Sequence, residues 1–237
     1  MDNAIYATLS RQSGLMREMQ VLAHNIANTS TTGFRREGVI FAEHVRAAGD
    51  GPSLSMPHAS ARHVDLAQGD LTQTGAPFDM AIRGEGFFLV ETPQGQRLTR
   101  AGSFTPNAEG ELVTPDGHRL LDAGGAPVFV PPDAGQATLA QDGTLSAGGR
   151  PLAQIGLWQP ADPLTLRHEA GTLFAADAVT PLEEPGVILQ GRLEGANINP
   201  VAEIARMIAV QRAYEAGQNL MDREDERIRG VIQTLGR

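Results

Sequence analysis

The sequence contains no cysteine, so it can form no disulfide bond, no thiolate nucleophile and no thiolate metal site. Aromatic residues are also scarce, at 5% of the chain with a single Trp. Ligand-binding clefts are lined largely by apolar and aromatic side chains, so this composition disfavours a glycan-processing or small-molecule site.

Long apolar runs are absent as well. No stretch approaches the roughly 18 uncharged residues that a membrane-spanning helix needs. The opening turns carry Asp2, Arg11, Arg17 and Glu18 instead of a basic stretch followed by an apolar one. We therefore expect no membrane insertion and no cleaved signal peptide.

Basic residues are outnumbered 19 to 28 by acidic ones, which gives a formal net charge of -9. Binding to nucleic acid requires a concentrated basic surface, and Arg35-Arg36 alone does not provide it. We therefore expect no nucleic-acid partner. The 41% of hydrophobic residues can form one large or two small cores. Glycine and proline concentrate in the middle of the chain, which predicts two architectures in one protein.

The N-terminal residues follow the spacing of a coiled coil, with alternating steps of four and three. This pattern predicts a helix from about Asn3 to Asn28. Its seam comprises Ile5, Leu9, Gln12, Met16, Met19, Ala23 and Ile26, and Leu15 and Leu22 widen the apolar face.

The C-terminal residues repeat this spacing in a second, longer helix. Asn199 can cap it, and Pro200 is tolerated as its first residue. The seam comprises Met207, Val210, Tyr214, Gly217, Met221, Glu224, Ile228, Val231 and Leu235. Since isolated helices are marginally stable, we expect both ends to be loose in the monomer. They can pair with each other, with other subunits, or with both.

The central residues follow a different pattern from the two ends. From Phe78 onward, short β-prone runs alternate with turn signals such as Asn107–Gly110 and Asp142-Gly143. We predict an α+β chain in which two long helices flank a mainly β domain of short antiparallel strands. The expected segments are 1–36 (N-terminal helix and exit), 37–77 (extended arm or linker), 78–190 (β-rich domain) and 191–237 (connector and helix).

Motifs for catalysis or cofactors are weak. The six histidines show no metal-ligand spacing, and "RGEGFFLV" at 83–90 lacks the third glycine of a dinucleotide loop. The charged run Asp222–Arg229 is typical of a solvated helix face. We expect no enzymatic activity, catalytic residue, cofactor or metal.

Three separated stretches resemble the bacterial flagellar rod, hook and hook-associated proteins. They are the opening "MDNAIYATLSRQSGLMREMQVLAHNIANTSTTGFRRE", the core "FDMAIRGEGFFLVETPQGQRLTRAGSFTPNAEGELVTPDGHRLL", and "GRLEGANINPVAEIARMIAVQRAYEAGQNLM". The residues that match the family motifs are Asn25, Asn28, Gly33, Phe34, Gly84, Gly86, Phe87, Phe88, Arg100, Gly102, Phe104, Leu193, Glu194, Asn197, Asn199 and Pro200. Gly195-Ala196 departs from the family, which commonly has a serine before the first Asn.

The resemblance implies a structural subunit of the flagellar rod, most similar to the proximal-rod type. Its helices would form an inner tube and its β domain an outer layer. It implies export without signal cleavage by the flagellar type III apparatus to the periplasmic rod, where the partners are other rod proteins or further copies. The expected assembly residues are Ile5, Leu9, Met16, Met19, Leu22, Ile26, Met207, Val210, Tyr214, Met221, Ile228 and Val231. The alternatives are a distal-rod or hook-type protein of the same family, and a secreted β-rich binding domain.

Overall fold

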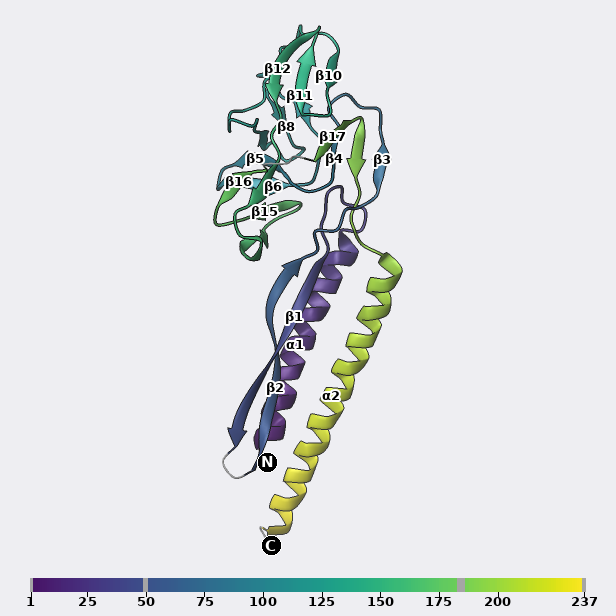
Figure 1. Ribbon diagram of the computed structural model, residues 1–237. Helices are drawn as coiled ribbons and strands as arrows, with labels where there is room; N and C mark the ends of the chain where they lie inside the picture. Colours follow the sequence, from purple (N-terminus) through teal and green to yellow (C-terminus); the bar gives the residue numbers. More distant parts are fainter. Residues whose placement is uncertain (1, 49–50, 183–185, 236–237) are drawn as a thin grey trace. The chain divides into compact units, whose positions relative to one another are not determined.

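The computed structural model describes residues 2–48, 51–182 and 186–235, and the side chains of 8–41, 62–182 and 186–234 (Figure 1). The chain divides into two compact units. Unit 1 contains Met1–Ala27, Glu37–His63 and Asn199–Arg237. Unit 2 contains Asn28–Arg36 and Val64–Ile198. The chain therefore passes from one unit to the other after Ala27, Arg36, His63 and Ile198.

Unit 1 consists of two long helices and a two-stranded sheet. The helices are α1 (Asp2–Ala27) and α2 (Pro200–Leu235), and the strands are β1 (Glu37–Ala48) and β2 (Gly51–Val64). α1 packs beside α2 and also contacts β1 (Figure 1). The segment expected to be an extended arm or linker thus forms β1 and β2 over residues 37–64. In the part of the chain that the structure describes, neither helix is apolar over enough of its length to cross a membrane.

The helix ends follow the sequence signals. Asn199 Oδ1 accepts a hydrogen bond of 3.1 Å from the Ala202 N–H, which confirms the predicted cap, and Pro200 is the first residue of α2. Beyond α1, the Thr31 N–H donates to the Asn28 carbonyl at 3.1 Å. Gly33 then reverses the chain with φ +73°, a conformation that costs a residue with a Cβ more than it costs glycine.

Unit 2 is built almost entirely of short strands. They are β3 (Leu71–Gln73), β4 (Met80–Arg83), β5 (Phe88–Thr92), β6 (Gly95–Thr99), β7 (Thr105–Pro106), β8 (Leu112–Val113), β9 (Arg119–Leu120), β10 (Ala137–Leu139), β11 (Thr144–Ala147), β12 (Arg150–Gln154), β13 (Trp158–Pro160), β14 (Arg167–His168), β15 (Leu173–Ala175), β16 (Val179–Pro181), β17 (Val187–Gln190) and β18 (Arg192–Glu194). A 3-10 turn, η1, spans Pro163–Thr165.

All pairings with a described register in unit 2 are antiparallel, as the hairpin pattern predicted. The largest sheet has seven strands in the order β14-β15-β6-β5-β9-β8-β7, and a second has the order β10-β11-β12. Three pairs complete the unit: β13 with β16, β17 with β4, and β18 with β3. In the last two pairs, strands from the C-terminal end of unit 2 (β17 and β18) pair with strands from its N-terminal part (β4 and β3). The two ends of the unit are therefore hydrogen-bonded to each other.

The core of unit 2 lies on both faces of β5. Phe88 and Val90 pack in one apolar cluster with Met80, whereas Leu89 packs in a second cluster with Phe174. Because successive strand residues point to opposite faces, a strand buried on both sides reads as a continuous apolar run. Phe88–Val90 of the run "GFFLV" therefore lie in β5, the central strand of the seven-stranded sheet. The broad prediction of a mainly β centre with a helix at each end is confirmed.

Candidate assembly site

Among the residues whose side chains are described, polar contacts connect α1 with α2 within unit 1. Gln12 Nε2 donates to the Tyr214 carbonyl at 2.8 Å. Arg206 Nε lies 2.7 Å from Glu18 Oε1. Asn25 Nδ2 donates to Glu203 Oε2 at 3.1 Å. Residue numbers rise along α1 as they fall along α2, so the helices run antiparallel.

The expected assembly residues divide by exposure. Leu22 and Val210 are buried, and the partly buried ones are Met19, Ile26, Met207, Tyr214, Met221 and Ile228. Leu9, Met16 and Val231 are exposed, while Ile5 lies outside the residues whose side chains are described. The chain therefore covers part of each predicted seam itself.

Two apolar stripes on the helix pair stay exposed. On α1, Leu9 and Met16 expose 49% and 41% of their surface. On α2, Val201, Ile204 and Ile208 are exposed by 77%, 49% and 46%. Steps of three, four and seven place each set on one face of its helix. These stripes are surfaces that another helix can cover.

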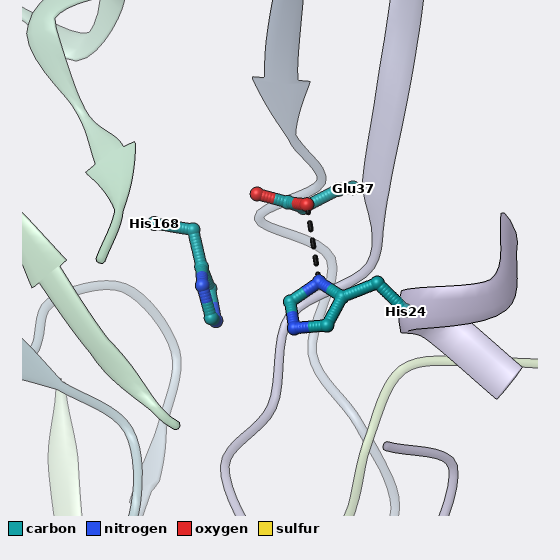
Figure 2. A group of neighbouring side chains, drawn as sticks. All are labelled: His24, Glu37 and His168. Carbon is teal, nitrogen blue, oxygen red and sulfur yellow. Dashed lines mark hydrogen bonds and ion pairs between the residues drawn. The ribbon is translucent and has the colours of Figure 1, made fainter. Parts of the chain in front are cut away.

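Asn25 joins three elements of unit 1. Its side chain is fully buried, accepts from the Glu37 N–H at 3.0 Å and donates to the Glu37 carbonyl at 2.8 Å. This amide thus closes a ring with the first residue of β1 while also reaching Glu203 at the start of α2. Figure 2 shows the neighbouring contact, in which His24 Nδ1 lies 3.3 Å from Glu37 Oε2. Arg62 Nη1 lies 3.8 Å from the same carboxylate oxygen.

Unit 2 contains a buried arginine cluster formed by Arg35, Arg100 and Glu194. Arg35 and Glu194 have no exposed surface, and Arg100 exposes 3%. Arg35 Nη2 lies 2.9 Å from Glu194 Oε1, and Arg100 Nη1 lies 3.6 Å from Glu194 Oε2. The guanidinium groups also donate to carbonyls, Arg35 to Ala67 at 2.6 Å and Arg100 to Gly84 at 2.6 Å.

Burial dominates the electrostatics of this cluster. It lowers the pKa of Arg100 to about 10, although the Glu194 carboxylate opposes that change, and the Arg35 charge adds to it. Burial also lowers the pKa of Arg35, again against the attraction of Glu194. With a pKa of about 10, Arg100 remains charged at neutral pH, and both guanidinium groups face one shared carboxylate.

Asn197, three residues after Glu194 in the sequence, hydrogen-bonds to two other segments of unit 2. Its Oδ1 accepts from the Arg36 N–H at 2.6 Å, and its Nδ2 donates to the carbonyls of Asp65 and Ala67 at 2.9 and 2.8 Å. The Glu194 carbonyl accepts from the Gly33 N–H at 2.7 Å. The exit strip (residues 28–36) and the connector (residues 191–198) are thus bonded to each other inside unit 2.

Comparison with known proteins gives the same family from separate parts of the chain. The family model described as flagellar hook protein FlgE/F/G D1 domain matches residues 81–147, and that described as flagellar basal body rod FlgEFG protein C-terminal matches residues 189–234. A flagellar basal-body rod protein FlgF of Caulobacter vibrioides is 40% identical over 249 residues, which cover 100% of this chain and 99% of the relative. The chain belongs to the flagellar basal-body rod protein family, FlgF type.

Further relatives agree with this membership. FlgF of Mesorhizobium japonicum is 38% identical over 100% of this chain and 99% of its own length. FlgG of Agrobacterium fabrum, another basal-body rod protein, is 30% identical over 92% of this chain and 93% of its own length. The protein is accordingly a structural subunit of the flagellar rod, as its sequence motifs predicted.

The family-motif residues of this rod protein occupy particular structural positions. Buried ones are Asn25, Gly33, Phe34, Gly86, Phe87, Phe88, Arg100, Gly102, Phe104 and Glu194; partly buried ones are Asn28, Leu193 and Asn197; exposed ones are Gly84, Asn199 and Pro200. Gly102 shows why a small residue is needed, since a Cβ there would lie 1.6 Å from the Met80 carbonyl oxygen. These positions serve backbone turns, close approaches and buried polar contacts.

Several structural residues of the rod subunit were not singled out from the sequence. Arg35 and Glu203 are buried charges that a hydropathy pattern places at the surface, and Glu18 is buried on the face that meets α2. For Arg35, the sequence offered one weak indication of burial: it directly follows the motif residue Phe34 at the turn after α1. No local pattern marks Glu18 or Arg206, whose pairing joins residues 188 apart in sequence.

Proposed function

We propose that this rod subunit belongs to the proximal rod and acts mechanically, transmitting torque from motor to hook through packed helices and catalysing nothing. The observation that carries the proposal is the pair of exposed apolar stripes on α1 and α2. A chain that ties its helices together with polar contacts yet leaves Leu9, Met16, Val201, Ile204 and Ile208 uncovered has a surface suited to neighbouring subunits.

The energetics favour this use of the stripes. Each of the five side chains still exposes two fifths or more of its surface, so covering it returns about 1 kcal/mol. Together they contribute about 5 kcal/mol per subunit, which changes an association constant by roughly a thousandfold or more. Many such contacts around a rod give stiffness although each contact is weak.

The partners proposed for these surfaces are other rod proteins or further copies of this chain, in helices that pack as coiled coils. We further propose export by the flagellar type III apparatus without signal cleavage, and assembly in the periplasmic part of the basal body. The division into an N-terminal helix, an arm, a β domain and a connector with a C-terminal helix remains our proposal for how the chain is used in the rod.

Deletion of the gene, followed by electron microscopy of isolated basal bodies, tests the proposed place in the rod. We expect a rod that is missing or stops near its base, and plasmid-borne wild-type gene should restore it. A rod that reaches the distal segment before stopping would support the distal-rod alternative. A complete, rotating flagellum in the deletion strain would refute the proposal.

A matched pair of substitutions tests the stripe itself. Ile208 and Ala209 are adjacent, both exposed, and point about 100° apart on α2. Ile208→Asp should abolish incorporation into basal bodies and swimming, whereas Ala209→Asp should retain both, with equal helix content by circular dichroism. Leu9→Asp on α1 should behave like Ile208→Asp. Normal swimming of both stripe variants would remove the basis of the proposed interface.

A further inference from the structure

The two seams do not by themselves define how α1 and α2 align. Each repeats apolar residues at steps of three and four, so a shift of one heptad again places apolar side chains opposite apolar side chains. Regular coiled-coil surfaces therefore tolerate slippage unless a polar or steric feature penalises the wrong alignment.

Both seams contain residues that interrupt the apolar pattern, and the structure brings one from each seam together. Gln12 is the polar residue of the α1 seam, and Gly217 is the glycine of the α2 seam. The Gln12 side chain, 7% exposed, fills the space that the missing Cβ leaves, because a Cβ on Gly217 would lie 2.3 Å from Gln12 Nε2. In this position Nε2 donates to the Tyr214 carbonyl at 2.8 Å.

The amide has little freedom to move away from this position. Retreating from a larger residue at 217 would break its bond to the Tyr214 carbonyl and leave a buried polar group without that partner. The contact is therefore both steric and polar: the absence of a Cβ at 217 leaves room for the Gln12 amide where it lies, and this alignment gives its N–H group an acceptor.

Two other polar contacts fix the same alignment. Glu18 meets Arg206 at 2.7 Å, and Asn25 meets Glu203 at 3.1 Å. A slip by one heptad moves α2 by about 10 Å, which separates all three pairs beyond hydrogen-bonding distance. The three contacts therefore penalise the same wrong alignments that the apolar seams permit.

We propose that Gln12 and Gly217 form a register lock that fixes the antiparallel pairing of α1 with α2 inside one chain. The lock selects the partner of each helix as well as its alignment. Seam residues that the helix pair buries, such as Val210, are not available to a neighbouring subunit, whereas Leu9 and Met16 of the α1 seam stay exposed. Subunits then meet through the exposed stripes instead of exchanging helices. This consequence rests on the proposed rod function, whereas the lock itself is a property of the single chain.

Two glycine substitutions in α2 give opposite expectations. Gly230 is the matched control, because a Cβ there meets no atom of the described residues within 4 Å. Helix propensity alone predicts that Gly217→Ala and Gly230→Ala both raise the melting temperature of the helices, measured on the full chain by circular dichroism. The lock predicts that Gly230→Ala raises it while Gly217→Ala lowers it. Gln12→Ala combined with Gly217→Ala should recover part of the loss by making room for the methyl group.

Register can be measured directly by spin-label distances. The chain has no native cysteine, so Gln20→Cys and Arg212→Cys, two exposed positions on α1 and α2, carry the only two labels. The full chain with an intact lock should give one narrow distance distribution. Gln12→Leu, which improves the apolar seam, should instead give a broad or split distribution, with an added peak from helices that have slipped by one heptad, about 10 Å along the helix axis.

The outcomes separate the lock from simple packing. A merely structural role for Gln12 predicts that Gln12→Leu keeps one narrow distance and melts higher. That result, or a Gly217→Ala variant that behaves like Gly230→Ala, would overturn the lock. Neither result would bear on the proposed rod function, which is tested separately by electron microscopy of basal bodies from the deletion strain.

Discussion

Replacing Glu194 with Gln tests how strongly one carboxylate holds unit 2 together. The substitution preserves the shape of the side chain, and its amide oxygen can still accept from the Gly69 N–H, now 2.9 Å from Glu194 Oε1. It removes the negative charge that faces Arg35 at 2.9 Å and Arg100 at 3.6 Å. Two buried guanidinium groups then remain without the anion that they share.

The magnitude follows from the burial of all three groups. Removing one partner of a buried ion pair costs about 3–5 kcal/mol, because the remaining charge stays desolvated. In a domain of roughly 150 residues this lowers the melting temperature by about 10–15 °C. The single Trp of the chain, Trp158, lies in unit 2, so its fluorescence follows the unfolding of this unit.

The control for this measurement is Glu109→Gln, an identical chemical change at an exposed residue. We expect it to change stability by less than about 0.5 kcal/mol. Replacing Arg35, Arg100 and Glu194 together with Met should recover much of the loss, because a cluster replaced by apolar side chains leaves no unpaired charge. If Glu194→Gln melts within about 2 °C of wild type, the cluster does not hold the two arginines in the way that the geometry indicates.

Two further predictions concern unit 2. Burial lowers the pKa of Arg100 from its ordinary value to about 10, so above about pH 10 the unfolded chain binds a proton that the folded chain lacks. The contribution of Arg100 to stability should therefore rise above about pH 10 by up to about 1.4 kcal/mol per pH unit, as measured by urea unfolding with Trp158 fluorescence. All 19 basic residues are Arg and both Tyr lie in unit 1. Because burial lowers the pKa of Arg35 as well, the variant with Met at positions 35, 100 and 194 should remove this slope, and a slope that persists in it would contradict the assignment. Separately, Gly102→Ala should prevent unit 2 from folding, since its Cβ would lie 1.6 Å from the Met80 oxygen. Gly117→Ala, where an added Cβ meets none of the described atoms within 4 Å, should cost only the roughly 1–2 kcal/mol of a positive φ; equal stability of the two variants in the same assay would count against this reading.

Local signals in the sequence predicted a large part of the fold. The α2 cap at Asn199, Pro200 as the first residue of α2 and the short antiparallel strands on either side of Asp142-Gly143 all appear where short-range chemistry places them. Each depends on a few adjacent residues, such as a side-chain acceptor before a first turn or a glycine at positive φ. The bounds of α1, Asp2–Ala27, likewise lie within a residue of the predicted ones.

Long-range pairings were not predictable in the same way. Periodicity identified the α1 seam, but it could not tell which of its residues α2 and β1 would cover and which the chain would leave exposed. Leu9 and Met16 therefore look equivalent to Leu22 in the sequence, although only Leu22 is buried. The burial of Arg35 depends on Glu194, which is 159 residues away, and no local pattern reports such a distance.

Polar and apolar contacts therefore have different tasks in this rod subunit. A net hydrogen bond within a folded chain adds only about 1 kcal/mol, but a misplaced partner leaves a buried group unsatisfied, so the contacts of Gln12, Asn25 and Glu194 penalise wrong alignments more than they strengthen the right one. Apolar stripes behave in the opposite way, because covering them is favourable in many similar alignments. A subunit that must join a rigid polymer benefits from fixing its own geometry with the first kind of contact and leaving the second kind exposed until neighbours arrive.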